Sequence, residues 1–267
     1  MRTRLVGGII AVMVLAVGWS MLTKLLPRRS SPQSQPASSA PVPRTRPRPR
    51  PASVATTSTA GTRIAVNESI GPGFMDLVAR AEIRRRIRAS FPYTYLSPIV
   101  AASNDSMLHR WDDRVGRPVR VFLPPDTVDN FQPAFLDAVR AAFGQWERAG
   151  VPVRFDTRAD SAEAEVYFSW RAQFDIDRTG QTDLEWDSEG HLKKGSVTIA
   201  THDPAGHPLA PDDVRVVALH EIGHLIGLDH SPDSTDVMFA KTVRRELSDR
   251  DVRTAQLLYS LAPGSLR

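Results

Sequence analysis

The middle of the chain shows two spacings of apolar residues, one typical of strands and one typical of helices. Residues 119–123 alternate apolar and polar side chains and stop at Pro124-Pro125, which predicts a β-strand. After it, large apolar residues recur every four positions and a glycine follows at Gly150, which predicts a long amphipathic helix. The residues on its apolar face are Phe131, Phe135, Val139, Phe143 and Trp146.

Shorter apolar segments predict the remaining elements. Two further strands are expected at residues 153–155 and 165–170, and a hairpin is expected where residues 182–186 and 192–200 flank a polar turn. A second large helix is expected at residues 213–225. Ser248, with Asp251 three residues later, predicts the N-cap of a closing helix. The pattern as a whole predicts an α+β fold with a mixed sheet.

The first 27 residues contain an uncharged apolar run from Leu5 to Thr23 between basic residues. The run is just long enough to span a bilayer, which predicts a signal-anchor for residues 1–27. A cleaved signal peptide is the alternative, because Ala16-Val17-Gly18 places small residues at suitable offsets. Trp19 favours retention. Either way, we expect the rest of the chain to be extracytoplasmic, anchored in the membrane or secreted.

Residues 28–62 are dominated by Pro, Ser, Arg and Ala, with arginine and proline alternating near residue 50. Such a composition cannot bury a core and predicts a disordered, extended linker. The linker contributes to the net charge of +4 and the pI of about 9.7. Its arginines could also bind anionic lipid headgroups or envelope polymers. We do not expect nucleic acid as a partner, because no aromatic residues interleave the cations.

Residues 63–107 are predicted to form a helical N-terminal segment. The helix docks beside the following domain in one interpretation, and in the other it is a pro-segment that covers the active-site cleft. The chain has no cysteine, so any inhibition by this segment would be steric. The residues near helical spacing are Phe74, Leu77, Val78, Ala81 and Ile87.

The candidate chemistry lies in residues 220–230, His-Glu-Ile-Gly-His-Leu-Ile-Gly-Leu-Asp-His. On a helix, His220 and His224 project from one face about a turn apart. Gly227 can adopt a positive φ that ends the helix and brings His230 back towards the same point. Three histidines and a water complete a tetrahedral zinc site, and Glu221 lies where its carboxylate reaches that water.

This arrangement predicts hydrolysis by an activated water. Zinc lowers the pKa of a bound water to about 7 and polarises a carbonyl. Glu221 is expected to be the general base that takes the proton of the water and returns it to the leaving amine. The bare two-histidine motif also occurs on ordinary solvated helix faces, whereas the extended spacing with Gly227 and His230 is far more specific.

The extended motif, followed by Met238, resembles the signature of the metzincin metallopeptidases. Ser231 directly after His230, and the closing segment at residues 247–259, are similar to the matrixin branch. The resemblance covers about residues 108–261. It implies that residues 108–267 form a catalytic domain with a twisted mixed sheet, an active-site helix and a C-terminal helix. By position, Met238 inherits the role of a floor beneath the metal ligands.

Two features depart from that family. Phe239-Ala240 follows the methionine where matrixins usually carry Tyr-Pro, so the shape of the specificity pocket does not carry over. The absence of cysteine excludes disulfides, thiolate ligands and a cysteine switch. His191, His202 and His207 do not reproduce the spacing of the family's second zinc site and are expected to be loop or surface residues.

The resemblance also implies the substrate. Metzincins bind an extended peptide along an edge strand, and residues 182–186 are the candidate edge, although Leu184 and Trp186 could instead pack inward. We therefore expect a monomeric zinc endopeptidase acting on proteins or peptides. The alternative is a catalytically silent envelope-binding protein with a structural zinc site. Glu221 discriminates the two, because a purely structural site does not need a carboxylate beside an open position.

Overall fold

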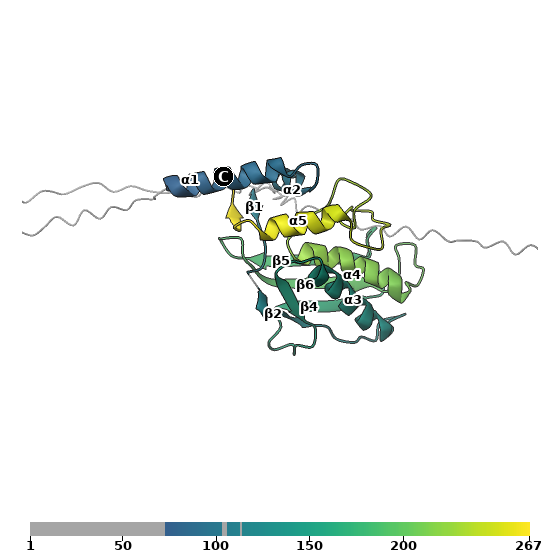
Figure 1. The fold of residues 1–267 in the computed structure, drawn as a ribbon. Helices are drawn as coiled ribbons and strands as arrows, with labels where there is room; N and C mark the ends of the chain where they lie inside the picture. The colour runs from purple at the N-terminus through teal and green to yellow at the C-terminus, as the bar shows by residue number, and fades with distance from the viewer. Residues whose placement is uncertain (1–72, 103–105, 113) are drawn as a thin grey trace, which may run out of the picture. The chain divides into compact units, whose positions relative to one another are not determined.

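The computed structural model describes residues 73–102, 106–112 and 114–267 (Figure 1). The predicted membrane segment and linker lie outside these residues. Within the described part of the chain, no helix is both long enough and apolar enough to cross a bilayer.

A five-stranded mixed sheet is the centre of the fold (Figure 1). Its order is β3-β2-β4-β6-β5, and the first four strands run parallel while β5 is antiparallel to β6. The predicted hairpin is therefore confirmed, and β5 lies at the edge of the sheet. The strands are β2 (Arg114–Phe122), β3 (Val153–Asp156), β4 (Val166–Arg171), β5 (Gly180–Trp186) and β6 (Leu192–Ala200).

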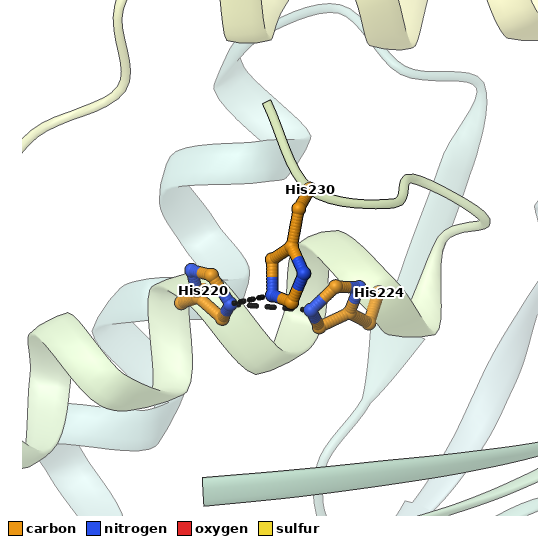
Figure 2. Close-up of side chains that lie close together, drawn as sticks. All are labelled: His220, His224 and His230. Atoms are coloured by element: carbon orange, nitrogen blue, oxygen red, sulfur yellow. Dashed lines mark hydrogen bonds between the residues drawn. The ribbon is translucent and has the colours of Figure 1, made fainter. Parts of the chain in front are cut away.

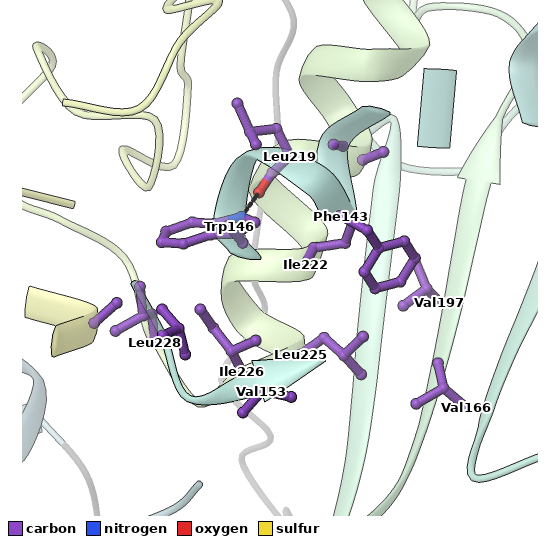
Figure 3. Packing of buried hydrophobic residues seen from close by; sticks show 14 of the residues in the cluster. Phe143, Trp146, Val153, Val166, Val197, Leu219, Ile222, Leu225, Ile226 and Leu228 are labelled. Atoms are coloured by element: carbon purple, nitrogen blue, oxygen red, sulfur yellow. Dashed lines mark hydrogen bonds between the residues drawn. The ribbon is translucent and has the colours of Figure 1, made fainter. Parts of the chain in front are cut away.

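Two long helices pack against each other and against the sheet. Helix α3 (Ala134–Arg148) buries the predicted face that includes Phe135, Val139 and Phe143. Helix α4 (Pro211–Leu225) begins with a proline, whose fixed φ suits the first turn. At the contact between them, the Trp146 indole Nε1 donates a hydrogen bond to the carbonyl oxygen of Leu219 at 2.9 Å (Figure 3).

The buried core lies between these helices and the sheet (Figure 3). Side chains from α4 meet others from α3 and from the strands, so the helix that carries the histidine motif is fixed on several sides. The burial and close packing of these apolar side chains are the main source of the rigidity of α4. Residues labelled in Figure 3 include Phe143, Trp146, Val166, Val197, Leu219, Ile222, Leu225 and Ile226.

The N-terminal segment forms α1 (Phe74–Ala89), α2 (Leu96–Ala102) and β1 (Met107–Leu108), which pairs with β7 (Gly264–Ser265) near the C-terminus. The helix α1 was predicted, but its apolar face was assigned wrongly. Phe74 is 78% exposed and Leu77 is 48% exposed, and only Ile87 of α1 is buried. Contact with the domain comes from the part of the helix from Arg80 onward, where Arg80 donates to the carbonyl oxygen of Arg267 and Arg86 donates to the hydroxyl of Ser260 at 2.9 Å.

Helix α5 (Asp249–Tyr259) closes the domain. The Ser248 hydroxyl accepts from the backbone N–H of Asp251 at 3.0 Å, and the Asp251 carboxylate accepts from the backbone N–H of Ser248 at 2.8 Å. This reciprocal pair is a capping box, so the predicted N-cap is confirmed.

Candidate metal centre

The second half of α4 carries His220, Glu221 and His224. His220 is fully buried and Glu221 is 1% exposed. Each helical histidine has one ring nitrogen bound to the backbone, because Nδ1 of His220 lies 2.7 Å from the carbonyl oxygen of Val237 and Nδ1 of His224 lies 2.8 Å from that of Leu228. A carbonyl only accepts, so both Nδ1 atoms carry the proton and both Nε2 atoms present a lone pair.

Gly227 ends the helical path and turns the chain back. Its φ is +100°, and the backbone N–H of Leu228 donates to the carbonyl oxygen of Gly223 at 3.0 Å. A Cβ at Gly227 would overlap the carbonyl oxygen of His109 and lie 3.1 Å from its carbonyl carbon. Glycine is therefore needed both for the left-handed conformation and for the close approach of another backbone segment.

The turn brings His230 to the two helical histidines (Figure 2). Nε2 of His220 lies 3.1 Å from Nε2 of His224 and 3.3 Å from Nε2 of His230. Tetrahedral ligands at about 2.0–2.1 Å from a zinc ion are about 3.3–3.4 Å apart. Within the residues described, these three histidines are the group of three or more ligand side chains that could hold a metal ion.

The electrostatic environment favours neutral imidazoles in this cluster. Burial, followed by the neighbouring His224 and His230, holds the pKa of His220 well below its usual value. Burial also lowers the pKa of His230 to about 4. Neutral rings are the form that binds a metal, and unshared lone pairs this close repel each other unless a cation lies between them. The donor set and its spacing therefore fit zinc.

Glu221 lies beside the cluster and contacts the edge strand. The Thr182 hydroxyl donates to Oε2 of Glu221 at 2.6 Å, whereas Oε1 is buried and has no hydrogen-bond partner among the described residues. Burial is also the largest influence on this carboxyl group and raises its pKa.

Met238 lies in the turn that follows the third histidine, where Ser231 pairs with Phe239. It is fully buried, and a Cβ added at Gly223 would overlap its sulfur and lie 2.9 Å from its Cε. The thioether therefore packs on the helix between the two histidine positions. The turn is closed by the backbone N–H of Ser231, which donates to the carbonyl oxygen of Met238 at 2.8 Å.

The methionine turn is held by Asp251 at the start of α5. One carboxylate oxygen accepts from the backbone N–H of Val237 at 2.8 Å, and the other accepts from the Tyr95 hydroxyl at 2.9 Å. The carbonyl group of Val237 in turn orients His220. Sequence reasoning assigned Asp251 to the cap of the closing helix but missed this network, because Tyr95 and Asp251 are 156 positions apart in the chain.

A cleft of about 310 Å³ adjoins the cluster. Its walls include α4, the edge strand β5 and the N-terminal helix α2, so the N-terminal segment contributes to the cleft as well as to the outer surface. Among its lining residues are Ile99, Met107, Thr182, Leu184, Glu221 and His224.

The three histidines expected in loops or at the surface, His191, His202 and His207, lie apart from this centre. His191 is 3.2 Å from a carboxylate oxygen of Asp112, and His207 is 2.9 Å from one of Asp203. His202 lies 3.5 Å from Asp129. Each therefore has its own acidic neighbour, and none belongs to the triad.

Comparison with known proteins is consistent with this geometry. The family model for matrixin, a group of peptidases, matches residues 123–260. Metalloendoproteinase 1 of Glycine max is 25% identical over 167 residues, which is 58% of this chain and 54% of that protein. Metalloendoproteinase 1-MMP of Arabidopsis thaliana is 29% identical over 137 residues, 46% of this chain and 37% of that protein.

A shorter match is to the probable matrix metalloproteinase 095L of Invertebrate iridescent virus 3, which is 38% identical over 66 residues. The match covers 24% of this chain and 18% of that protein. The chain thus spans about half the length of the first relative and less of the other two.

Proposed function

The chain belongs to the matrixin family, and on that premise we propose that it is a zinc-dependent endopeptidase that cleaves extracytoplasmic proteins or peptides. The observation that carries the proposal is the meeting of three Nε2 atoms whose two helical members already donate Nδ1–H to backbone carbonyls. Metal-ligating imidazoles donate their other ring N–H to a backbone carbonyl or a carboxylate in this way.

His220, His224 and His230 would hold the zinc ion. When bound, zinc supplies Lewis-acid chemistry, because it lowers the pKa of a water to about 7 and polarises the carbonyl to be attacked. Met238 supports the ligands from below by packing on α4 at Gly223. The backbone carbonyls of Val237 and Leu228 hold the two helical rings in orientation.

Glu221 is the proposed general base. Its Oε2 accepts the Thr182 hydrogen bond, which leaves Oε1 to take a proton from the attacking water. The same oxygen then delivers that proton to the nitrogen of the leaving amine. No side chain becomes covalently attached to substrate in this scheme.

Substrate recognition is proposed to occur along β5. This strand lies at the sheet edge and its hydrogen-bonded neighbour β6 occupies one side only. Backbone groups on the other side can pair with an extended peptide, which favours proteins or peptides with little dependence on one particular side chain. Trp186, which is 48% exposed and lies 4.2 Å from His109 between ring centroids, marks the end of this edge.

The organisation of the chain completes the proposal. Residues 1–27 would anchor the protein or direct its export, residues 28–62 would form the linker, and residues 63–107 would precede the catalytic domain at residues 108–267. The apolar run and the arginine-proline composition support this division. We propose that the enzyme acts as a monomer.

The test is to purify the full chain, measure bound zinc and follow cleavage of a peptide library, alongside Glu221→Gln. We expect the variant to keep its zinc and to lose at least about 10²-fold in kcat, because the proton acceptor is removed. Glu163→Gln, which changes an exposed carboxylate, is the matched control and should leave kcat unchanged.

Equal cleavage by wild type and Glu221→Gln would contradict the mechanism. A fully zinc-loaded wild-type chain that cleaves nothing in the library would favour the alternative, a catalytically silent envelope-binding protein with a structural zinc site.

A further inference from the structure

Thr182 makes a short contact with the proposed base. Its hydroxyl lies 2.6 Å from Oε2 of Glu221 and 3.1 Å from the carbonyl oxygen of the same residue. The shorter distance is that of a charge-assisted O–H···O bond. Thr182 lies within β5, paired with Val197 of β6, so the donor is attached to a hydrogen-bonded strand.

Gly180 provides the space that the carboxylate occupies. A Cβ at this position would overlap Oε1 of Glu221 and lie 2.7 Å from both Cδ and Cγ. The φ of Gly180 is not in the left-handed region, since the positive-φ glycines are others. Glycine is therefore required here by the side chain of Glu221 and not by the backbone conformation.

These two residues face the same way. Positions 180 and 182 lie on one face of a strand and position 181 on the other. The face with Gly180 and Thr182 is the one that meets α4, which packs directly against β5. Gly180 thus leaves space for the side chain of Glu221, and Thr182 donates a hydrogen bond to it.

We propose that Gly180 and Thr182 are positioning residues that fix the carboxylate of Glu221, holding Oε2 so that Oε1 remains available for the water. The inference rests on the proposed function. Without these contacts a glutamate side chain samples several rotamers, and it occupies the reactive one for only part of the time. The strand that receives the peptide backbone would then also place the base, so that one element aligns both reactants.

The first test compares Thr182→Val with Thr182→Ser in the full chain. Valine keeps the branched shape without the hydroxyl, and serine keeps the hydroxyl. We expect Thr182→Val to lower kcat about 10-fold with KM and bound zinc unchanged, and Thr182→Ser to recover to within about threefold of wild type. Thr198→Val on β6 removes a hydroxyl that forms a hydrogen bond with Ser169 at 2.8 Å, and it should leave kcat unaltered.

The second test is Gly180→Ala, which leaves Thr182 intact. The added methyl group meets the far end of a flexible side chain, so folding should be little affected while the carboxylate is displaced. We expect kcat to fall about 10- to 100-fold, in line with the effect of misplacing a catalytic group by about 1 Å. Crystal structures of both variants should show Glu221 shifted or in more than one conformation, with zinc still bound.

The outcomes separate this inference from the proposed function. Suppose that Glu221→Gln is slow, whereas Thr182→Val and Gly180→Ala have the wild-type kcat with Glu221 in its original position. The positioning roles of Thr182 and Gly180 are then wrong, and the role of Glu221 as general base still holds. If Thr182→Ser is as slow as Thr182→Val, the hydroxyl is not what matters. If Glu221→Gln is as active as wild type, the proposed function itself fails.

Discussion

Helix α4 and the loop that follows it, residues 226–239, hold the histidines by different means. In the helix, His220 and His224 are placed by a regular four-residue spacing on an element buried on several sides. In the loop, the position of His230 depends on one glycine with a φ of +100° and on a turn tied to α5 through Asp251.

This difference implies different sensitivity to remote changes. The backbone positions of the helical pair are secured by the packing of α4, and the loop enters only through the carbonyl groups of Val237 and Leu228 that orient the two rings. The loop has few regular backbone hydrogen bonds of its own and relies on Asp251, which in turn binds Tyr95 in the N-terminal segment. A substitution far from the metal ligands can therefore act on the centre through the loop.

The largest effect is expected from Gly227→Ala. Alanine adds left-handed strain and a methyl group that overlaps the carbonyl oxygen of His109, which belongs to a backbone that cannot easily move. We expect a loss of about 3 kcal/mol in the free energy of unfolding, together with weakened zinc binding. Denaturant unfolding and chelator competition measure the two quantities.

Gly206→Ala is the matched control for that experiment. Gly206 has a φ of +86°, and nothing lies within 4 Å of an added Cβ. The free energy of unfolding should therefore fall by the backbone strain alone, about 1 kcal/mol. Equal losses in the two variants would show that the contact with His109 contributes nothing.

A smaller effect is expected from Tyr95→Phe. The change removes the hydrogen bond to Asp251 while keeping the ring, and Tyr95 is 1% exposed. We expect a loss of about 1–2 kcal/mol in unfolding free energy and roughly threefold weaker zinc binding. Tyr93→Phe, at a residue 63% exposed, should change neither. If the two variants behave alike, the N-terminal segment does not support the loop.

Much of the helical side of the centre could be predicted from sequence, because its determinants are local. The period of α3, the extent of α4 and the cap of α5 follow from spacing and from capping residues, whereas the edge position of β5 was expected from the family resemblance. The metal-ligand spacing is likewise a property of a single helix and one glycine.

The supporting contacts could not be predicted. Tyr95 meets Asp251 across 156 positions, and Thr182 meets Glu221 across 39, and neither pair leaves a local pattern. Helix α1 is the opposite case, because a local pattern was present but the burial it predicted does not occur. Its apolar spacing suggested a buried face, but Phe74 and Leu77 are exposed because the described tertiary contacts of the helix begin only at Arg80. Periodicity reports which face could be buried and not which part of a helix meets a partner.

The most direct test of the account is the zinc content and zinc affinity of the full chain, compared with those of His230→Ala. We expect about one zinc ion per wild-type chain and at least about 100-fold weaker binding in the variant, because the helix alone offers two ligands. His207→Ala, at an exposed histidine outside the triad, should bind zinc as wild type does. Retention of wild-type affinity by His230→Ala would contradict a centre shared between helix and loop.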